Sequence, residues 1–303
     1  MLSSTVSALL RSAGLDPGSV ETVVRAAIAE DLAGGTDVTS EATVPAGQLS
    51  VGDFVARKPG VVAGIPVALA VLESTATSGS LRWRERSTDG DRVEPSDVLL
   101  TARMDTRAFL TAERTALNLL GHLSGIATLT REWVDAVAGT GAQIRDTRKT
   151  TPGLRALEKY AVRCGGGTNH RMSLSDAALV KDNHVIATGG VGAAFDAVRS
   201  RWPELRLEVE VDSLDELREV LARGAELVLL DNFDIAGLRE AVALTDGRAR
   251  LEASGGLSLE VAHDVAATGV DYLAVGALTH SAAALDVALD LRSGVEASRE
   301  EGF

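Results

Sequence analysis

RLEVEVDS (206–213), AELVLLDNF (225–233), ARLEASGGL (249–257) and VDYLAVGAL (270–278) repeat one pattern, a short apolar run followed at once by polar or glycine residues. Each run has the length of a buried strand, and an amphipathic, helix-like stretch separates it from the next. Strands that alternate with helices in this way form parallel pairs joined by right-handed crossovers. The second half of the chain is therefore predicted to be a parallel α/β structure.

The number of these repeats predicts an incomplete barrel. An ordinary eight-fold α/β barrel needs about 250 residues, and the repeating region, which begins near residue 140, is much shorter. We expect an α/β barrel of six or seven strands. An open doubly wound sheet is the alternative, weakened because no GxGxxG follows the first strand. The expected strands are 142–145, 178–181, 206–211, 227–230, 250–253 and 272–275.

The first 140 residues have a mixed pattern that predicts an α+β domain. Asp16 and Pro17 have the residue types of a helix N-cap and first turn, and Gly34-Gly35 would end that helix after about Asp31. Apolar and polar residues alternate at 49–57 and 81–87, as in strands with one buried face. The remaining expected elements are strands at 49–57, 81–87 and 98–102, a turn at 90–95, and helices at 65–76 and about 106–137.

Composition restricts the class of protein. The 303 residues are 45% hydrophobic and 24% charged, which is ordinary for a folded protein and excludes general disorder. A single cysteine, Cys164, excludes an intrachain disulfide. The net charge of −13 argues against a nucleic-acid or anionic-membrane binder. No signal peptide and no run of 18 apolar residues is recognised, so we expect a cytoplasmic protein.

Polar residues gather where each expected strand ends. The chemistry of α/β barrels sits at the carboxyl ends of the strands, so these residues are candidates for a single site. Loops are polar anyway, but six such groups in register are hard to explain by solvation alone. The groups are 145–150, 181–184, Glu208 with Glu210 and Asp212, Asp231-Asn232, 254–256, and Gly276-Ala277 with Thr279 and His280.

Residues 145–184 are basic within this acidic protein. They hold eight Lys or Arg against four acidic residues, a net charge of +4. His170 and Arg171, placed after three glycines, add further hydrogen-bond donors. A positive cleft in an acidic protein suits a small, multiply charged anion, because Arg matches carboxylates and phosphates and Lys adds a point charge. The alternative is a set of surface ion pairs, which are common and contribute little.

Two further features suggest how such an anion would be held. The glycine turns at 254–256 and 276–277 would aim backbone N–H groups at a phosphate. Glu210 and Asp231 would project from neighbouring strands, where paired carboxylates could bind ribose hydroxyls or Mg²⁺. A buried pair satisfied by nearby Arg is the plainer alternative. Lys181 could instead form a Schiff base, as in barrel aldolases.

Motifs that occur in order over nearly the whole chain carry a family resemblance. They are Glu30-Asp31-Leu32, GTDVT (35–39), TAERTALNLL (111–120), TRKTTPGLR (147–155), EKYAVRCGGGTNHR (158–171), LVKDNH (179–184), EVEVDSLDE (208–216), LLDNF (229–233), EASGGL (252–257) and VGALTHS (275–281). This ordered set resembles the quinolinate phosphoribosyltransferase family. One small departure is Ala274, where relatives often carry Ser.

The resemblance implies an activity and an architecture. The reaction would join quinolinate to phosphoribosyl pyrophosphate and give nicotinate mononucleotide, pyrophosphate and CO₂ in NAD biosynthesis, with Mg²⁺ and no redox cofactor. An N-terminal α/β sandwich would occupy 1–118 and an incomplete α/β barrel 119–282, with a tail at about 283–303 returning to the sandwich. The protein would be a homodimer whose sites lie between one barrel and the partner's N-terminal domain, without nucleic-acid or membrane partners.

The resemblance also implies roles for single residues. Arg114 would be lent to the quinolinate carboxylates in the partner's site, and Lys149 would bridge toward the phosphoribosyl substrate. Glu210 and Asp231 would hold ribose hydroxyls and Mg²⁺ and, with Lys149 and Lys181, would be catalytic. The dicarboxylate pocket would be lined by Arg148, His170, Arg171 and Lys181, and the 5′-phosphate would be cradled by Ser254, Gly255, Gly256, Gly276 and Ala277. Thr147 and His280 would be further substrate-binding residues.

Other functions remain open on the sequence. A related phosphoribosyltransferase-like protein of molybdate-transport operons would use another substrate. A Schiff-base aldolase would be trapped on Lys181 by borohydride with its substrate. A scaffold or small-anion binding protein would have kept the fold without the activity.

Overall fold

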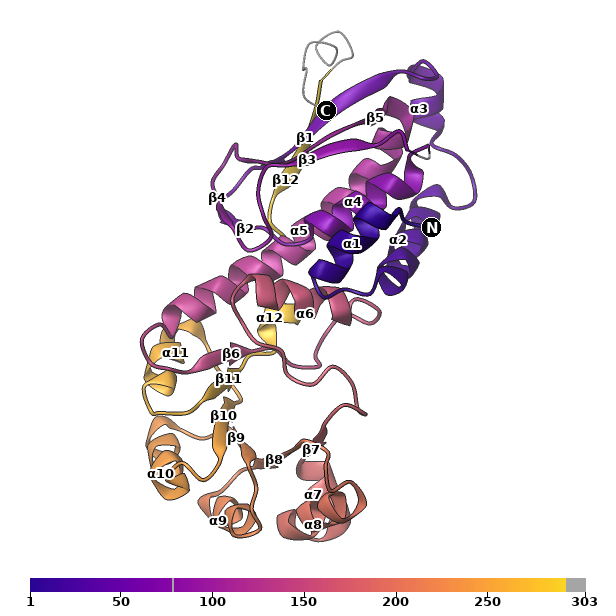
Figure 1. The fold of residues 1–303 in the computed structure, drawn as a ribbon. Helices are drawn as coiled ribbons and strands as arrows, with labels where there is room; N and C mark the ends of the chain where they lie inside the picture. Colours follow the sequence, from indigo (N-terminus) through magenta and orange to yellow (C-terminus); the bar gives the residue numbers. More distant parts are fainter. Residues whose placement is uncertain (78, 293–303) are drawn as a thin grey trace. The chain divides into compact units, whose positions relative to one another are not determined.

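The computed structural model describes residues 1–77 and 79–292, and the chain forms two compact units (Figure 1). Unit 1 comprises Met1–Leu129, Thr151–Gly165 and the described part of Ser281–Phe303, and unit 2 comprises Thr130–Thr150 and Gly166–His280. The end of the predicted tail, 293–303, lies outside the described residues. Within the described ranges, no helix is both long and apolar enough to cross a membrane.

Unit 1 is built on an antiparallel sheet. Its four strands lie in the order β12 (Val287–Arg292), β1 (Leu49–Ala56), β5 (Val98–Asp105) and β3 (Arg82–Glu85). β12, from the far end of the chain, pairs with β1 in a register that sets Val51 opposite Arg292. Helices lie along one face of this sheet (Figure 1). The helices and short strands are α1 (Ser4–Ser12), α2 (Pro17–Leu32), α3 (Val38–Thr43), β2 (Gly60–Val61), α4 (Ile65–Thr75), β4 (Arg92–Val93), the first part of α5 (Thr106–Ala136), and α6 (Arg155–Cys164).

Local sequence explains where these elements begin and end. Asp16 caps α2 by accepting the backbone N–H of Ser19 at 2.8 Å. The helix ends at Leu32, and the following Ala33 is already left-handed at φ 46°, one residue before the predicted glycine pair. The predicted turn at 90–95 contains β4, which pairs with β2. The long helix α5 runs through its glycines, and a Cβ on Gly125 would lie 2.1 Å from the Ala283 carbonyl oxygen, so Gly here allows close backbone approach.

Unit 2 is a parallel sheet of six strands. Their order is β6 (Gln143–Arg145), β11 (Tyr272–Ala274), β10 (Arg250–Ser254), β9 (Leu227–Asp231), β8 (Leu207–Val211) and β7 (Ala178–Val180). All six predicted strands are confirmed within one residue at either end. In the described residues β6 and β7 are the two edges of the sheet, so the barrel is incomplete, as expected. The helices are α7 (Asp182–Thr188), α8 (Val191–Arg201), α9 (Leu214–Ala222), α10 (Ile235–Thr245), α11 (Leu259–Ala266) and α12 (Ala277–His280).

The sheet register brings the polar strand ends to one edge. α8 to α11 lie outside the curved row of strands (Figure 1), and apolar residues such as Val209, Val228 and Leu230 are fully buried within it. Asp231 at the end of β9 stands beside Ser254 at the end of β10. Because all six strands run in the same direction, their polar carboxyl ends share a single rim.

Candidate active site

A cavity of about 450 Å³ opens at the carboxyl ends of the strands in unit 2. Nine residues predicted from the sequence line it, which agrees with the expectation that the strand ends form one site. They are Thr147, Arg148, Lys149, His170, Arg171, Lys181, Glu210, Asp231 and Ser254. Its other walls are made by Leu179, Leu229, Glu252 and Ala274.

Two arginine side chains face this cavity without an acidic partner. In the described part of the chain, neither Arg148 nor Arg171 forms an ion pair, and Nε of Arg148 is buried without a hydrogen bond. Burial and, next, the nearby charge of Arg148 lower the pKa of Arg171. Nη1 of Arg171 donates to the Ala177 carbonyl at 3.0 Å, which fixes the direction of the side chain. Two adjacent guanidinium groups of this kind create a site for an anion with more than one negative charge.

Lys181 and the carboxylates occupy the other side of the cavity. Nζ of Lys181 forms an ion pair with Glu210, which projects from β8. Asp231 accepts a hydrogen bond from the side-chain amide of Asn232 at 2.7 Å. A lysine held against a carboxylate binds anions as a cation, whereas an aldolase needs a free amine. The geometry therefore disfavours the Schiff-base interpretation.

Glycine is required at one of the predicted phosphate turns. Gly255 has a φ of 92°, and a Cβ on it would lie 2.2 Å from Oδ1 of Asn232. Gly276 lies against Lys149 and His280, since a Cβ on this glycine would be 3.1 Å from Cδ of Lys149 and 3.3 Å from Nε2 of His280. These turns lie at the ends of β10 and β11, next to the cavity, but Gly255, Gly256, Gly276, Ala277 and His280 do not line it.

Lys149 and Arg114 are both exposed, in different units. Oγ1 of Thr279 donates to the Lys149 carbonyl at 2.8 Å, so the backbone of Lys149 is tied to the loop after β11 while its side chain is exposed. Arg114 lies on α5 in unit 1 with an exposed side chain. Its proposed role in a partner's site stays a prediction.

Sequence reasoning did not assign roles to a group of buried polar side chains in and behind the wall of the cavity. Glu208 and Glu252 are 3% and 0% exposed, and Arg145 pairs with Glu252. Asp146 accepts the backbone N–H of His170 at 2.8 Å. The available signal was the presence of charged residues inside otherwise apolar strands, LEVEV and RLEAS.

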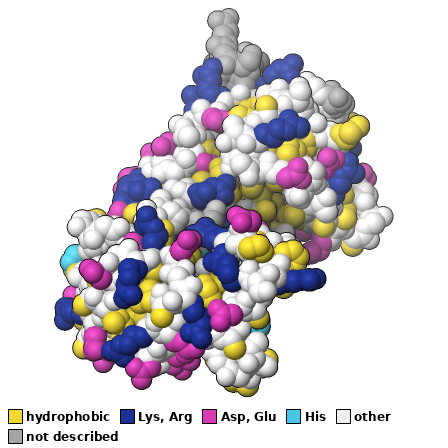
Figure 2. Space-filling model, turned by 60° about the horizontal axis from the view of Figure 1, so that its bottom comes forward, with side chains coloured by type: hydrophobic (Ala, Val, Ile, Leu, Met, Phe, Trp, Pro, Cys, Tyr) yellow, Lys and Arg dark blue, Asp and Glu magenta, His cyan; other side chains and the backbone are white. Residues whose placement is uncertain are grey.

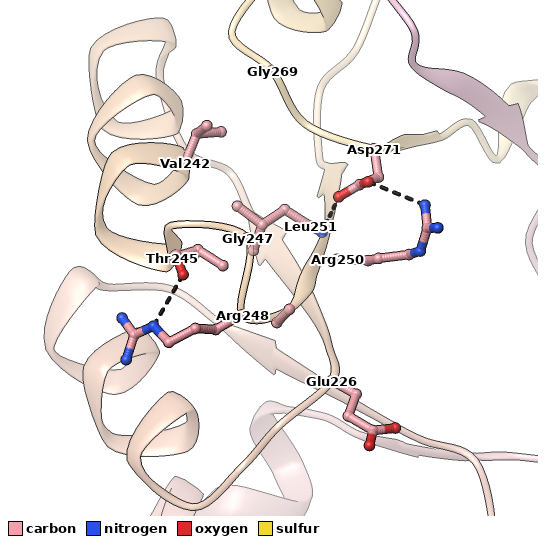
Figure 3. A pocket seen from close by; sticks show the side chains of 10 residues that line it. Glu226, Val242, Thr245, Gly247, Arg248, Arg250, Leu251, Gly269 and Asp271 are labelled. Carbon is pink, nitrogen blue, oxygen red and sulfur yellow. Dashed lines mark hydrogen bonds and ion pairs between the residues drawn. The ribbon is translucent and has the colours of Figure 1, made fainter.

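A second cavity, of about 420 Å³, lies at the opposite, amino-terminal ends of the strands (Figure 3). Its charged residues balance, with Arg248 and Arg250 against Glu226 and Asp271. Arg250 pairs with Asp271 at 3.2 Å, and Nε of Arg248 donates to the Thr245 carbonyl at 3.0 Å. It therefore lacks the uncompensated charge of the first cavity. On the face shown in Figure 2, basic and acidic side chains are interspersed and form no broad basic patch of the kind that binds a polyanion.

An incomplete α/β barrel with a cationic cavity, paired carboxylates and glycine turns at its strand ends defines an enzyme for anionic, phosphate-bearing substrates. Two family models match the chain, the quinolinate phosphoribosyl transferase N-terminal domain over 37–124 and the C-terminal domain over 126–290. The chain belongs to the quinolinate phosphoribosyltransferase family and is a phosphoribosyltransferase.

Individual relatives agree with this assignment. The chain is 57% identical to a nicotinate-nucleotide pyrophosphorylase (carboxylating) of Mycobacterium leprae, over 88% of this chain and 95% of that one. It is 38% identical to a probable nicotinate-nucleotide pyrophosphorylase (carboxylating) of Bacillus subtilis, over 89% and 93%. The crystal structure of NadC from Streptococcus pyogenes matches with a TM-score of 0.88 and 37% identity, covering 92% of this chain and 98% of that chain.

Proposed function

We propose that this enzyme transfers the phosphoribosyl group of phosphoribosyl pyrophosphate to quinolinate and releases CO₂, giving nicotinate mononucleotide and pyrophosphate for NAD biosynthesis. The observation that carries the proposal is the pair of arginines, Arg148 and Arg171, facing the cavity without acidic partners. Quinolinate carries two adjacent carboxylates on a pyridine ring. Two guanidinium forks and the Lys181 ammonium supply the positive charge that these two carboxylates require.

The phosphoribosyl substrate is proposed to lie across the neighbouring strand ends. Glu210 and Asp231 line the same cavity from adjacent strands and offer acceptors for ribose hydroxyls. The turns at Ser254–Gly256 and Gly276–Ala277 would present backbone N–H groups to the 5′-phosphate. Lys149, at the rim, would contact the pyrophosphate.

The donor set also fits Mg²⁺. Glu210 and Asp231 supply carboxylate oxygens, which this ion prefers, at the open side of the cavity. When bound together with phosphoribosyl pyrophosphate, Mg²⁺ would screen the charge of the leaving pyrophosphate. The two carboxylates are thus proposed to serve both the sugar and the metal.

The chemistry needs positioning more than a strong base. As the bond from ribose C1 to pyrophosphate breaks, C1 gains positive charge, and the carboxylates of Glu210 and Asp231 compensate it. The pyridine nitrogen attacks C1 and the ring becomes a pyridinium. The 2-carboxylate then leaves as CO₂, its electron pair stays on ring C2 beside the positive nitrogen, and a proton from water completes the product.

The assembly is proposed to be a homodimer that works in the cytoplasm. Each site would then receive Arg114 from the partner subunit as a further cation for the quinolinate carboxylates. This arrangement accounts for an exposed arginine in a motif far from the cavity along the chain.

The test is an assay of purified protein with phosphoribosyl pyrophosphate and Mg²⁺, with either quinolinate or nicotinate as the acceptor. Chromatography measures nicotinate mononucleotide. We expect product from quinolinate and little from nicotinate, which lacks the 2-carboxylate and one negative charge. Equal turnover of the two acceptors, or none of quinolinate, would refute the proposal.

A further inference from the structure

A cluster of titratable side chains lies buried at the wall of the cavity, which two of them, His170 and Glu252, line. It contains His170, Glu208, Glu252 and Arg145, with exposed fractions of 9%, 3%, 0% and 4%. Arg145 comes from β6, Glu208 from β8 and Glu252 from β10, so the cluster joins three strands across the sheet. Charges buried to this degree cost free energy unless they are paired, which makes their hydrogen-bond pattern informative.

The contacts of the His170 ring define its tautomer. Nδ1 accepts the backbone N–H of Arg171 at 2.8 Å, so Nδ1 carries no proton. Nε2 lies 2.6 Å from Oε2 of Glu208, and it must therefore carry the proton and donate it to that carboxylate. Both ring nitrogens are engaged by the protein. In this arrangement the single ring N–H of His170 points to Glu208 rather than to a substrate carboxylate, although the ring lines the cavity.

We propose that Glu208 is a positioning residue for the anion site, acting through the tautomer of His170 on Arg171. The carboxylate holds the proton on Nε2, which leaves Nδ1 free to anchor the Arg171 amide. The Arg171 side chain is then fixed by its hydrogen bond to the Ala177 carbonyl, so its guanidinium is held toward the cavity. The inference rests on the proposed function, because it takes quinolinate as the anion that Arg171 binds.

The same cluster has the residue types of a metal site, but its hydrogen bonds favour a different interpretation. The possible ligand atoms of His170, Glu208 and Glu252 all lie within 4.8 Å of one another. A metal ion bound to Nε2 would need that nitrogen to be unprotonated. Because Nδ1 accepts a hydrogen bond, however, the ring proton lies on Nε2. The Arg145 guanidinium already provides the positive charge beside Glu252. Glu208 therefore acts as a hydrogen-bond acceptor.

The experiment combines a spectroscopic and a kinetic measurement. Protein labelled with ¹⁵N at its five histidines is examined by long-range ¹H–¹⁵N correlation, and His170→Gln assigns the signals of His170. We expect the Nε2–H tautomer in the wild type and in Glu208→Gln, since the amide oxygen of Gln still accepts. In Glu208→Ala that tautomer should be lost, and the quinolinate KM should rise by about 10-fold or more while the phosphoribosyl pyrophosphate KM stays constant.

The control is Glu226→Ala, which replaces an exposed glutamate at the far cavity of Figure 3 and should change neither the KM values nor the His170 signals.

A wild-type His170 protonated on Nδ1 would overturn the inference even in an active enzyme, as would an equal rise of both KM values in Glu208→Ala. Displacement of the His170 signals by stoichiometric Zn²⁺ would also overturn it. If Glu208→Ala does not fold, loss of the Nε2–H tautomer in Glu208→Gln is the deciding contrary result. Failure of the proposed function is separate, because the wild type would then be inactive with quinolinate.

Discussion

Replacement of Arg148 by Ala should weaken quinolinate binding without lowering the thermal stability of the protein. A charge-assisted hydrogen bond contributes about 1.5–3 kcal/mol, and Arg148 is proposed to make a two-pronged contact with a quinolinate carboxylate. A loss of about 3 kcal/mol corresponds to roughly a 100-fold rise in the quinolinate KM, at about 1.4 kcal/mol per factor of ten. In the free protein Arg148 has no ion-pair partner among the described residues and faces Arg171, so its removal relieves repulsion. We therefore expect Tm to stay constant or rise.

Steady-state kinetics and thermal unfolding measure the two effects on the same preparation. Arg250→Ala is the matched control, because Arg250 lies at the opposite end of the sheet and pairs with Asp271 at 3.2 Å (Figure 3). This control should leave the quinolinate KM unchanged. A quinolinate KM for Arg148→Ala within about threefold of the wild type would refute the reasoning, because Arg148 would then contribute little to binding. A Tm lowered by several degrees would also refute it, because Arg148 would then stabilise the fold.

Three further predictions concern a glycine turn, a buried carboxyl group and the proposed shared site. Gly255→Ala should lower the free energy of unfolding, measured by denaturant titration, by about 2 kcal/mol. The loss should exceed that of Gly256→Ala, because a Cβ on Gly255 would lie 2.2 Å from Oδ1 of Asn232, whereas a Cβ on Gly256 would meet no neighbour within 4 Å. An equal loss in the two variants would contradict this. Burial and the Glu208 carboxylate raise the pKa of Glu252 to about 7. The protonated Glu252 carboxyl therefore stabilises the fold at low pH, and this contribution is lost as the pH rises through about 7. Glu252→Gln should flatten the fall in Tm between about pH 5 and 8, and an unchanged slope would be evidence against this account. Mixed Arg114→Ala and Lys149→Ala proteins should regain activity once their subunits exchange, whereas inactivity after proven exchange would exclude a shared site.

The strands of unit 2 could be predicted from the sequence because the sheet is parallel and buried on both faces. Such strands read as short, continuous apolar runs, and LVLLD in β9 is an example. Their ends were visible because each run stops at polar or glycine residues. The rim of the cavity then followed from one rule, that parallel strands bring their carboxyl ends together.

The pairing of the charged groups could not be predicted in the same way. Glu208 and Glu210 lie two residues apart on β8, so their side chains point to the same face of the sheet. Glu208 nevertheless contacts His170 in the interior, whereas Glu210 pairs with Lys181 at the rim. That difference depends on depth in the folded sheet, which the alternation of a strand does not encode. Likewise the left-handed backbone after α2 begins at Ala33, one residue before the left-handed Gly34, although alanine has no intrinsic preference for that conformation.

The strand ends of unit 2 are proposed to hold a doubly negative pyridine and to remove one of its carboxylates. The most direct test is a turnover measurement with quinolinate labelled with ¹⁴C in the 2-carboxylate, in which released CO₂ and nicotinate mononucleotide are counted together. We predict one labelled CO₂ for each nucleotide formed, with both lost in parallel when Arg148 or Arg171 is replaced. A nucleotide that retains the label, or label released at the same rate without phosphoribosyl pyrophosphate, would contradict this mechanism.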